Sequence, residues 1–203
     1  MAHITRLSEL DLTASYSYAD YMTWRLTEAV ELIKGKIQLM SPAPNVKHQR
    51  ISWQLGGVLF NYLDRKDCAA FSAPFDVRLH DRTKSLLANK DITTVVQPDI
   101  CVICDQEKLD EQGCNGAPDW IVEILSKGNC KKEVKIKYAL YAESGVTEYW
   151  LIYPYEEVIH QFVLNDETGQ YHLHNSYAGD DVAVPYLFPD LAIDLSTLFK
   201  DVQ

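Results

Sequence analysis

Two acidic residues stand inside apolar segments in which an ordinary core strand would carry no charge. Asp99 follows Pro98 in QPDICVIC, and Glu123 lies within APDWIVEIL. A charge in such a segment is unfavourable unless a counter-charge pairs with it or a cation binds it. Two carboxylates with a backbone carbonyl and water suit Mg²⁺, which prefers oxygen ligands. The pair therefore indicates a divalent metal site. The alternative is a loop-end aspartate and a glutamate that pairs with a lysine or an arginine.

A lysine that follows this pair favours the metal site. On a helix expected over residues 131–144, Lys137 projects between Leu140 and Tyr141, inside the apolar arc. From that side of the helix it could reach the two carboxylates. The alternative is an i,i+4 pair with Glu133, which stabilises a helix by only about 0.2–0.5 kcal/mol. The two contacts are compatible with each other.

Two further residues are weaker candidates for the same site. Glu31 lies in an expected hairpin and shares a face with Ile33, so we expect it to be half-buried. His48 lies at the N-terminal end of the apolar face of a predicted helix. A histidine in such a position is more often a core or capping residue than a catalyst. Either residue could complete a site around the metal.

Other patterns that resemble metal sites are less convincing. Cys101 and Cys104 have CxxC spacing, but residues i and i+3 of a strand point to opposite faces, so we interpret both as buried core thiols. His172 and His174 share a strand face near His160, which is compatible with zinc. No fourth ligand is evident, and a surface hairpin is the favoured interpretation. The sequence contains no GxGxxG, no phosphate-binding GxxxxGK and no GxSxG motif.

The elements that must position these residues follow from hydrophobic periodicity. In chain order we predict a short helix from Ser17 or Asp20 to Leu26, a hairpin at 30–40, a helix at 46–65, strands at 73–80, 96–104 and 119–125, a helix at 131–144, a strand at 146–154 and a hairpin around 166–169. The segment SPAP at 41–44 interrupts the chain, and 81–94 is a polar connection. The apolar tail is expected to pack back on the core.

This order of elements predicts the fold class. The pattern αβββαβ is typical of an α/β protein in which helices flank a mixed β-sheet, here with an N-terminal and a C-terminal β-hairpin. A chain of 203 residues without repeats or linkers is expected to form a single domain, 1–203.

Composition narrows the class of protein. Apolar residues make up 47% of the chain and charged residues 24%, as in ordinary globular proteins. No apolar run could cross a bilayer and the N-terminus lacks the apolar core of a signal peptide, so we expect a cytoplasmic protein. The cysteine number, 5, is odd and the spacing irregular, so a disulfide framework is not expected. The net charge of −10 argues against broad non-specific nucleic-acid binding, although a local basic patch or a bound metal would still permit an enzyme that acts on nucleic acid.

The order Pro98-Asp99, Glu123 and then a lysine resembles the PD-(D/E)XK nuclease superfamily, which has the restriction-endonuclease-like fold. More closely, the chain is similar to a branch of uncharacterised bacterial single-domain proteins known as putative restriction endonucleases. The similarity covers residues 20–195. It rests on ELIKGKIQLMSPAP, the helix opened by His48, FDVRL, QPDI, PDWIVEILS and KYALYAESGVTEYWLIYP, of which the last two are the most specific.

The resemblance implies that Asp99 and Glu123 are metal-binding acids. The lysine that normally follows two residues after the glutamate is replaced here by Leu125, and Lys137 matches a lysine that takes its place on the next helix in this branch. Smaller departures remove no ligand. They are Ser126-Lys127-Gly128-Asn129 in place of SPST, Glu133 in place of Asp and Tyr153-Pro154 in place of DP.

The function that the resemblance implies is metal-assisted phosphodiester hydrolysis, with DNA as the default substrate. Asp99, Glu123 and the carbonyl of Ile124 would hold Mg²⁺ or Mn²⁺, which activates a water and neutralises charge on the phosphate. Lys137 would orient the water or stabilise the transition state. Glu31 would hold a second metal or a water.

His48 would contact phosphate or order the site. A homodimer is expected, because two strands must be cut.

Two alternatives stay open. One is a catalytically silent or regulatory dimeric scaffold, in which Lys137 would only pair with Glu133 and apolar side chains would fill the pocket. The other is a hydrolase of a small phosphorylated or nucleotide substrate, with a closed pocket. An active nuclease would instead bring Asp99, Glu123 and Lys137 together in an electronegative pocket beside a basic rim.

Overall fold

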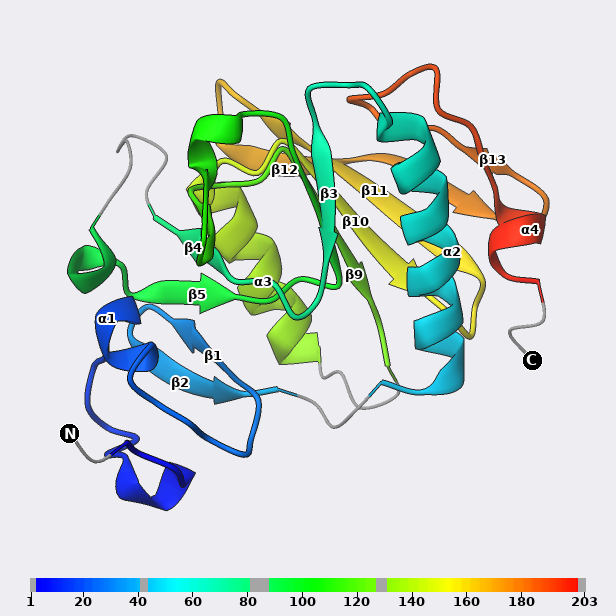
Figure 1. The fold of residues 1–203 in the computed structure, drawn as a ribbon. Helices are drawn as coiled ribbons and strands as arrows, with labels where there is room; N and C mark the ends of the chain where they lie inside the picture. The colour runs from blue at the N-terminus through cyan, green and yellow to red at the C-terminus, as the bar shows by residue number, and fades with distance from the viewer. Residues whose placement is uncertain (1–2, 41–43, 81–87, 127–130, 201–203) are drawn as a thin grey trace.

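The computed structural model describes residues 3–40, 44–80, 88–126 and 131–200 (Figure 1). Three features of the sequence therefore lie wholly or mostly outside the described residues: the SPAP interruption, much of the connection at 81–94, and residues 127–129. Within the described ranges, no helix is both long enough and apolar enough to cross a membrane.

Within the part of the chain that the structure describes, two six-stranded sheets form the frame, and a third sheet has two strands. The large sheet has the order β12-β11-β10-β9-β6-β3 and contains β3 (Ala69–Ser72), β6 (Ile100–Ile103), β9 (Trp120–Ile124), β10 (Glu148–Tyr153), β11 (Val158–Asn165) and β12 (Gln170–Ala178). The second sheet has the order β2-β1-β5-β4-β8-β7 and contains β1 (Val30–Ile33), β2 (Lys36–Leu39), β4 (Val77–Leu79), β5 (Thr94–Val96), β7 (Leu109–Asp110) and β8 (Gly113–Asn115). Strands β13 (Val182–Ala183) and β14 (Ile193–Asp194) pair with each other.

Helices α2 (Val46–Leu63) and α3 (Lys131–Ser144) cover the large sheet through two separate cores, and the short α4 (Leu195–Leu198) belongs to the core of α2. The short α1 (Tyr18–Tyr21) packs instead in a third core with β1 and β5 of the second sheet. Short 3₁₀ turns lie at Leu7–Glu9, Asn89–Asp91 and Gln106–Lys108. Leu55 of α2 packs in one core with Val122, whereas Tyr141 of α3 packs in the other with Ile121. Since successive residues of β9 point to opposite faces, α2 and α3 cover opposite faces of the sheet (Figure 1).

The predicted fold class is confirmed, as are both hairpins and the two long helices. Strand β10 runs parallel to β9, while β6 and β11 run antiparallel to their neighbours, so the sheet is mixed. The predicted helix at 46–65 ends at Leu63, and the helix at 131–144 has the predicted bounds. At the turn of the first hairpin, Lys34 and Gly35 both adopt positive φ, 50° and 79°, which explains the glycine there.

The continuous strand predicted at 96–104 is divided between the two sheets. Its first part is β5 in the second sheet and its last part is β6 in the large sheet, so residues 97–99 cross from one sheet to the other. Pro98 has no N–H to donate to a ladder, which explains why pairing stops there. Strand β3 was not predicted, and the strand predicted at 73–80 is reduced to β4. The crossing fixes Asp99 between the sheets.

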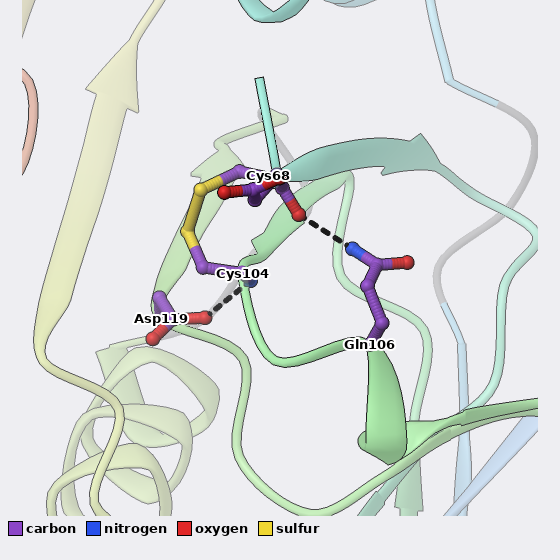
Figure 2. Close-up of a disulfide and its surroundings, with 5 residues drawn as sticks. Cys68, Cys104, Gln106 and Asp119 are labelled. Carbon is purple, nitrogen blue, oxygen red and sulfur yellow. Dashed lines mark hydrogen bonds between the residues drawn. A yellow bond between two sulfur atoms is a disulfide. The ribbon is translucent and has the colours of Figure 1, made fainter. Parts of the chain in front are cut away.

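The described residues contain a disulfide that the sequence does not predict. Cys68 and Cys104 are joined by a disulfide (Figure 2). Ala69 of β3 pairs with Ile103 of β6, and continuing this antiparallel register by one position brings the two cysteines face to face. The interpretation of Cys104 as a core thiol is therefore corrected, whereas Cys101 is a buried free thiol as predicted. The cysteine pattern no longer supports a reducing compartment, and the cytoplasmic location stays a prediction.

Polar contacts surround this disulfide. The backbone N–H of Cys104 donates to Asp119 Oδ2 at 2.7 Å, and the side chain of Gln106 donates to the carbonyl of Asp67 at 2.7 Å (Figure 2). The ends of β3 and β6 are thereby held together both covalently and by hydrogen bonds.

The C-terminal tail packs back on the core as predicted, and a buried carboxylate holds it there. Glu148 is 0% exposed, and its Oε1 accepts hydrogen bonds from Trp150 Nε1 at 2.6 Å and Gln161 Nε2 at 2.7 Å. It also accepts from the backbone N–H groups of Tyr186 and Leu187, each at 2.9 Å. These donors offset the unfavourable burial of the charge, and two of them belong to the tail.

We expect Glu148→Gln to destabilise the protein by about 2 kcal/mol, because the amide NH₂ would face a backbone N–H and leave a buried donor without an acceptor. Chemical denaturation measures this loss, and limited proteolysis should show faster cleavage of the tail. The matched variant Glu156→Gln, at an exposed position, should stay within about 0.5 kcal/mol of the wild type. Equal stabilities for the two variants would show that Glu148 does not anchor the tail.

Candidate active site

Asp99 directly precedes β6, and Glu123 lies at the facing position of the neighbouring strand β9. Ile100 of β6 pairs with Val122 of β9 in antiparallel register, and continuing that register by one residue places Asp99 opposite Glu123. Side chains of directly opposed residues share a face, with Cβ atoms about 5 Å apart. This register brings the two carboxylates together, and the charge of Asp99 acts on Glu123.

Main-chain atoms of β9 complete this corner of the site. The N–H of Ile124 donates to Asp99 Oδ2 at 2.7 Å. In an antiparallel pair the N–H and C=O of one residue face the same partner strand, so the carbonyl of Ile124 is directed to the side on which Asp99 lies. Two carboxylates and this carbonyl form the oxygen set that the sequence predicts for a metal.

His48 approaches Asp99 from the N-terminal turn of α2. Asn45 caps this helix by accepting a hydrogen bond from the His48 N–H at 3.0 Å. The imidazole Nε2 lies 3.0 Å from Asp99 Oδ1, and its Nδ1 is buried with no hydrogen-bond partner among the described residues. The ring thus fixes the orientation of the Asp99 carboxylate.

Lys137 connects the two sheets through their carboxylates. Its side chain extends from α3, is 10% exposed, and donates to Glu31 Oε1 at 3.1 Å and to Glu123 Oε1 at 3.0 Å. Glu31 comes from β1 and is buried rather than half-buried, with 4% of its surface exposed. The N–H of Gln97 donates to Glu31 Oε1 at 2.9 Å, which ties Glu31 to the crossing segment that carries Asp99.

Sequence reasoning missed two groups of residues around this core. Tyr141, one helical turn after Lys137, donates from its hydroxyl to Glu123 Oε1 at 2.5 Å; its spacing of four residues from the lysine was the available signal. Gln97 also donates from its side chain to Asp76 Oδ1 at 2.8 Å, and the Tyr18 hydroxyl donates to Asp76 Oδ2 at 2.8 Å. No local pattern indicates this second chain of contacts.

Burial and charge shift the pKa values within the cluster. Burial raises the pKa of Glu123 to about 7, helped by the charges of Asp99 and Glu31 and opposed by Lys137 and the Tyr141 hydroxyl. Burial opposes the charge of Lys137, but Glu123 and Glu31 outweigh it, so the pKa of the lysine is raised. Burial, with the same two glutamates, raises the pKa of Tyr141 well above its ordinary value. Lys137 therefore stays charged, and Tyr141 stays a neutral donor.

The donor set fits a divalent cation. Lys137 pairs with the two carboxylates of Glu31 and Glu123, and Asp99 next to them pairs with His48, so three carboxylates share one lysine and one histidine. Among the described residues, no group of three or more His, Cys, Asp or Glu side chains is arranged to hold a metal ion. A cation would therefore take two carboxylates, a main-chain carbonyl and water, a composition that suits Mg²⁺ because it keeps several waters.

The five predicted catalytic residues thus come together: Asp99, Glu123, Lys137, Glu31 and His48. Of the histidines considered as zinc ligands, His172 and His174 lie close together, with ring centroids 6.0 Å apart, but His160 does not join them. His160 pairs with Ser176 across β11 and β12, whereas His172 pairs with Val163. The favoured interpretation of that segment as a hairpin agrees with the structure.

Comparison with known proteins bears on the family and on the fold. A family model, Uma2, described as "Putative restriction endonuclease", matches residues 18–196. A crystal structure of "a putative nuclease belonging to DUF820" from Anabaena variabilis ATCC 29413 is similar, with 22% sequence identity and a TM-score of 0.71 over 93% of this chain and 99% of that chain. At this identity the similarity shows the fold alone. No curated protein matches the chain. The predicted restriction-endonuclease-like fold is confirmed.

Proposed function

We propose that this chain, which belongs to the Uma2 family of "Putative restriction endonuclease" proteins, is a nuclease that uses Mg²⁺ or Mn²⁺ to hydrolyse phosphodiester bonds, with DNA as its substrate. Membership of the family supports a nuclease, and restriction-endonuclease-like proteins generally use divalent metals. The metal requirement, the choice of DNA and the roles of individual residues are our own proposals.

The observation that carries the proposal is the position of Lys137. A buried lysine that only stabilised the fold would need one counter-charge, but Lys137 bonds to both Glu31 and Glu123 beside the facing Asp99. The scaffold alternative requires apolar side chains in the pocket and Lys137 paired only with Glu133. The convergence of Lys137 with Glu31 and Glu123 supports the enzyme, because there an ammonium group and a bound cation would share the carboxylate of Glu123.

Each residue can be given a role in hydrolysis. Asp99 and Glu123, with the carbonyl of Ile124, would hold the cation. When bound, a divalent cation lowers the pKa of a water ligand and neutralises charge on the phosphate. Lys137 would donate hydrogen bonds to the attacking water or to the phosphate oxygen on which charge develops. Glu31 holds Lys137 in place, a positioning role rather than the second metal ligand considered from the sequence.

The outer residues would keep this geometry fixed. His48 orients Asp99, and Tyr141 donates to the Glu123 oxygen that also accepts from Lys137. Such preorganisation matters because displacement of a catalytic group by about 1 Å can reduce the rate about a hundredfold.

The test of this function is a cleavage assay on end-labelled DNA in the presence of Mg²⁺, Mn²⁺ or EDTA, combined with titration calorimetry of each metal. We expect cleavage that requires the metal and binding of the cation to the wild-type protein. A protein that binds neither cation, with or without DNA, and leaves DNA intact would instead be a scaffold. The homodimeric state is not tested by the structure of one chain and stays a prediction.

The raised pKa of Glu123 predicts that metal binding depends on pH. Glu123 must lose its proton before it can ligate a cation. With a pKa of about 7, only about a tenth of the groups are ionised at pH 6 and about nine tenths at pH 8. We therefore expect Mn²⁺ to bind roughly tenfold more weakly at pH 6 than at pH 8, measured by calorimetry.

The control for this pH effect is Glu123→Gln, which cannot titrate at this position. It should bind Mn²⁺ weakly and with a flatter pH dependence than the wild type. Equal Mn²⁺ affinity of the wild type at pH 6 and pH 8 would mean that Glu123 does not ligate the metal.

A further inference from the structure

A groove of about 1430 Å³ leads away from the candidate active site. It runs between α2 and β3, and we call it the α2 groove. Asp99 and His48 line it at the end next to the carboxylates, and Leu63 and Cys68 line it where α2 ends. A substrate chain that reaches Asp99 along this path must therefore contact α2.

The wall formed by α2 presents two exposed aromatic side chains. Trp53 is 84% exposed and Phe60 is 77% exposed, and both line the groove. At about 100° per residue they lie on one face of the helix, opposite the buried face. Exposed apolar side chains that gather in one patch beside a groove can mark a ligand-binding surface.

Two glycines between these aromatics leave space on the same face. A Cβ added at Gly57 would meet no atom within 4 Å, and one added at Gly56 would meet only the Ser72 hydroxyl, at 3.9 Å. Trp53 and Phe60 are separated by about 10 Å along the helix axis, which matches about three steps of stacked bases at about 3.4 Å each. The shape of this face suits a short row of flat rings.

The charges of the groove do not suit a duplex. Its lining residues include three acids, Glu28, Asp64 and Asp99. They also include the basic residue Arg65 and, beside Asp99, His48. The basic rim expected of a nuclease that cuts duplex DNA is therefore not found among these residues. A duplex offers mainly phosphates, whose binding requires basic side chains. A strand with unpaired bases also carries phosphates, but its exposed bases can in addition stack on aromatic rings, which contributes about 1–3 kcal/mol per base.

We propose that the α2 groove binds a nucleic-acid strand with unpaired bases, which stack on Trp53 and Phe60 and guide the phosphodiester to Asp99 and Glu123. This inference rests on the proposed nuclease function and narrows its substrate to single-stranded or locally unpaired nucleic acid. The continuity of the groove with the carboxylates favours a strand as the occupant. The competing occupant is a second copy of this chain.

The tryptophans provide a direct probe of this groove. Of the 4 tryptophans, Trp24, Trp120 and Trp150 are buried, at 6%, 0% and 0% exposure, so quenching by a ligand in solution reports on Trp53. The wild type is titrated with a single-stranded oligo(dT) and with a duplex of the same length, in EDTA to prevent cleavage. We expect the single strand to quench the fluorescence and to bind at least tenfold more tightly than the duplex.

Variants then test the stacking residues. We expect Trp53→Ala and Phe60→Ala each to weaken binding of oligo(dT) at least fivefold, measured by the fluorescence anisotropy of a labelled oligo(dT). A fivefold loss corresponds to the lower end of the free-energy range for stacking of one base on an aromatic ring. The control Tyr186→Ala removes an aromatic residue that is 51% exposed outside the groove, and it should bind like the wild type. Because all three residues are exposed, thermal melting should be unchanged.

Three results would overturn the inference. The first is binding of the duplex that is as tight as, or tighter than, binding of the single strand. The second is an oligo(dT) affinity that is unchanged in both groove variants. The third is a dimer, detected by light scattering, that Trp53→Ala converts to a monomer, which would assign the groove to a second copy of the chain. These failures differ from failure of the nuclease function. If Trp53→Ala loses oligo(dT) binding but the wild type cleaves no DNA, the strand groove is supported and the proposed hydrolysis is rejected. If the wild type shows metal-dependent cleavage but the groove variants bind oligo(dT) like the wild type, hydrolysis is supported and the strand groove is rejected.

Discussion

Asp99→Ala is expected to abolish metal-dependent cleavage, with a loss of at least about a thousandfold. Asp99 supplies one of the two carboxylates that face each other across β6 and β9. Loss of a metal ligand removes several kcal/mol of transition-state stabilisation, and each 1.36 kcal/mol corresponds to about tenfold in rate. The same variant should show no Mg²⁺ binding by calorimetry.

Two variants make this result interpretable. Asp166→Ala removes an exposed carboxylate in the turn between β11 and β12, and it should cleave and bind metal like the wild type. Asp99→Asn keeps an oxygen that can accept from the Ile124 N–H but lowers the charge, so it should fold normally and still lose metal affinity. If Asp99→Ala cleaves DNA at the rate of the wild type, the assignment of Asp99 to the active site is wrong.

Lys137→Met is expected to lose cleavage by about a hundredfold or more while it retains metal binding. The substitution keeps much of the side-chain length but removes the ammonium group that would contact the reacting water or phosphate. Removal of one such electrostatic donor commonly lowers kcat about 10²–10³-fold. Cleavage rates at saturating Mn²⁺, together with calorimetry, separate the loss of chemistry from a loss of metal.

The same variant should also be less stable without metal. Glu31 and Glu123 would lose the cation that pairs with both of them, and breaking a buried pair in this way costs about 3–5 kcal/mol. Mn²⁺ should restore more of the melting temperature in Lys137→Met than in the wild type, because binding to the native state alone is stabilising. Lys135→Met, at an exposed position of the same helix, is the control. If Lys137→Met cleaves DNA at the rate of the wild type, Lys137 only stabilises the fold.

The parts of the site that the sequence predicts are those with a local signal. Asp99 and Glu123 stand out because charges interrupt apolar strands, and Lys137 stands out because helical periodicity places it on the core face. The bounds of α3 and the turn at Gly35 follow from equally local patterns. In each case, short-range geometry fixes the direction of the side chain.

The parts that the sequence does not predict depend on contacts between distant segments. Glu31 meets Lys137 across 106 positions, and no periodicity reports such a contact. The crossing between the two sheets was taken for one strand, because Pro98 within an apolar run signals an interruption without showing where the chain continues. The disulfide was missed because Cys68 lies opposite Cys104 only through the register of β3, a strand that was itself not predicted.

The sequence likewise does not predict the α2 groove on the exposed surface. Trp53 and Phe60 contribute nothing to the pattern that defines the buried face of α2, and they attract attention only when their exposure and the position of Asp99 are known. Exposed aromatics beside a catalytic site are better guides to the substrate than buried ones, because packing does not explain them.

The central claim is that a divalent cation binds between Asp99 and Glu123, and a crystal structure of the protein soaked in Mn²⁺ tests it most directly through anomalous scattering. We expect an anomalous peak with oxygen atoms of Asp99, Glu123 and the Ile124 carbonyl at about 2.1 Å, as for Mg²⁺ sites. The absence of a peak at these oxygens, with Glu123 still bonded only to Lys137 and Tyr141, would contradict the claim and assign the carboxylates to the stability of the fold.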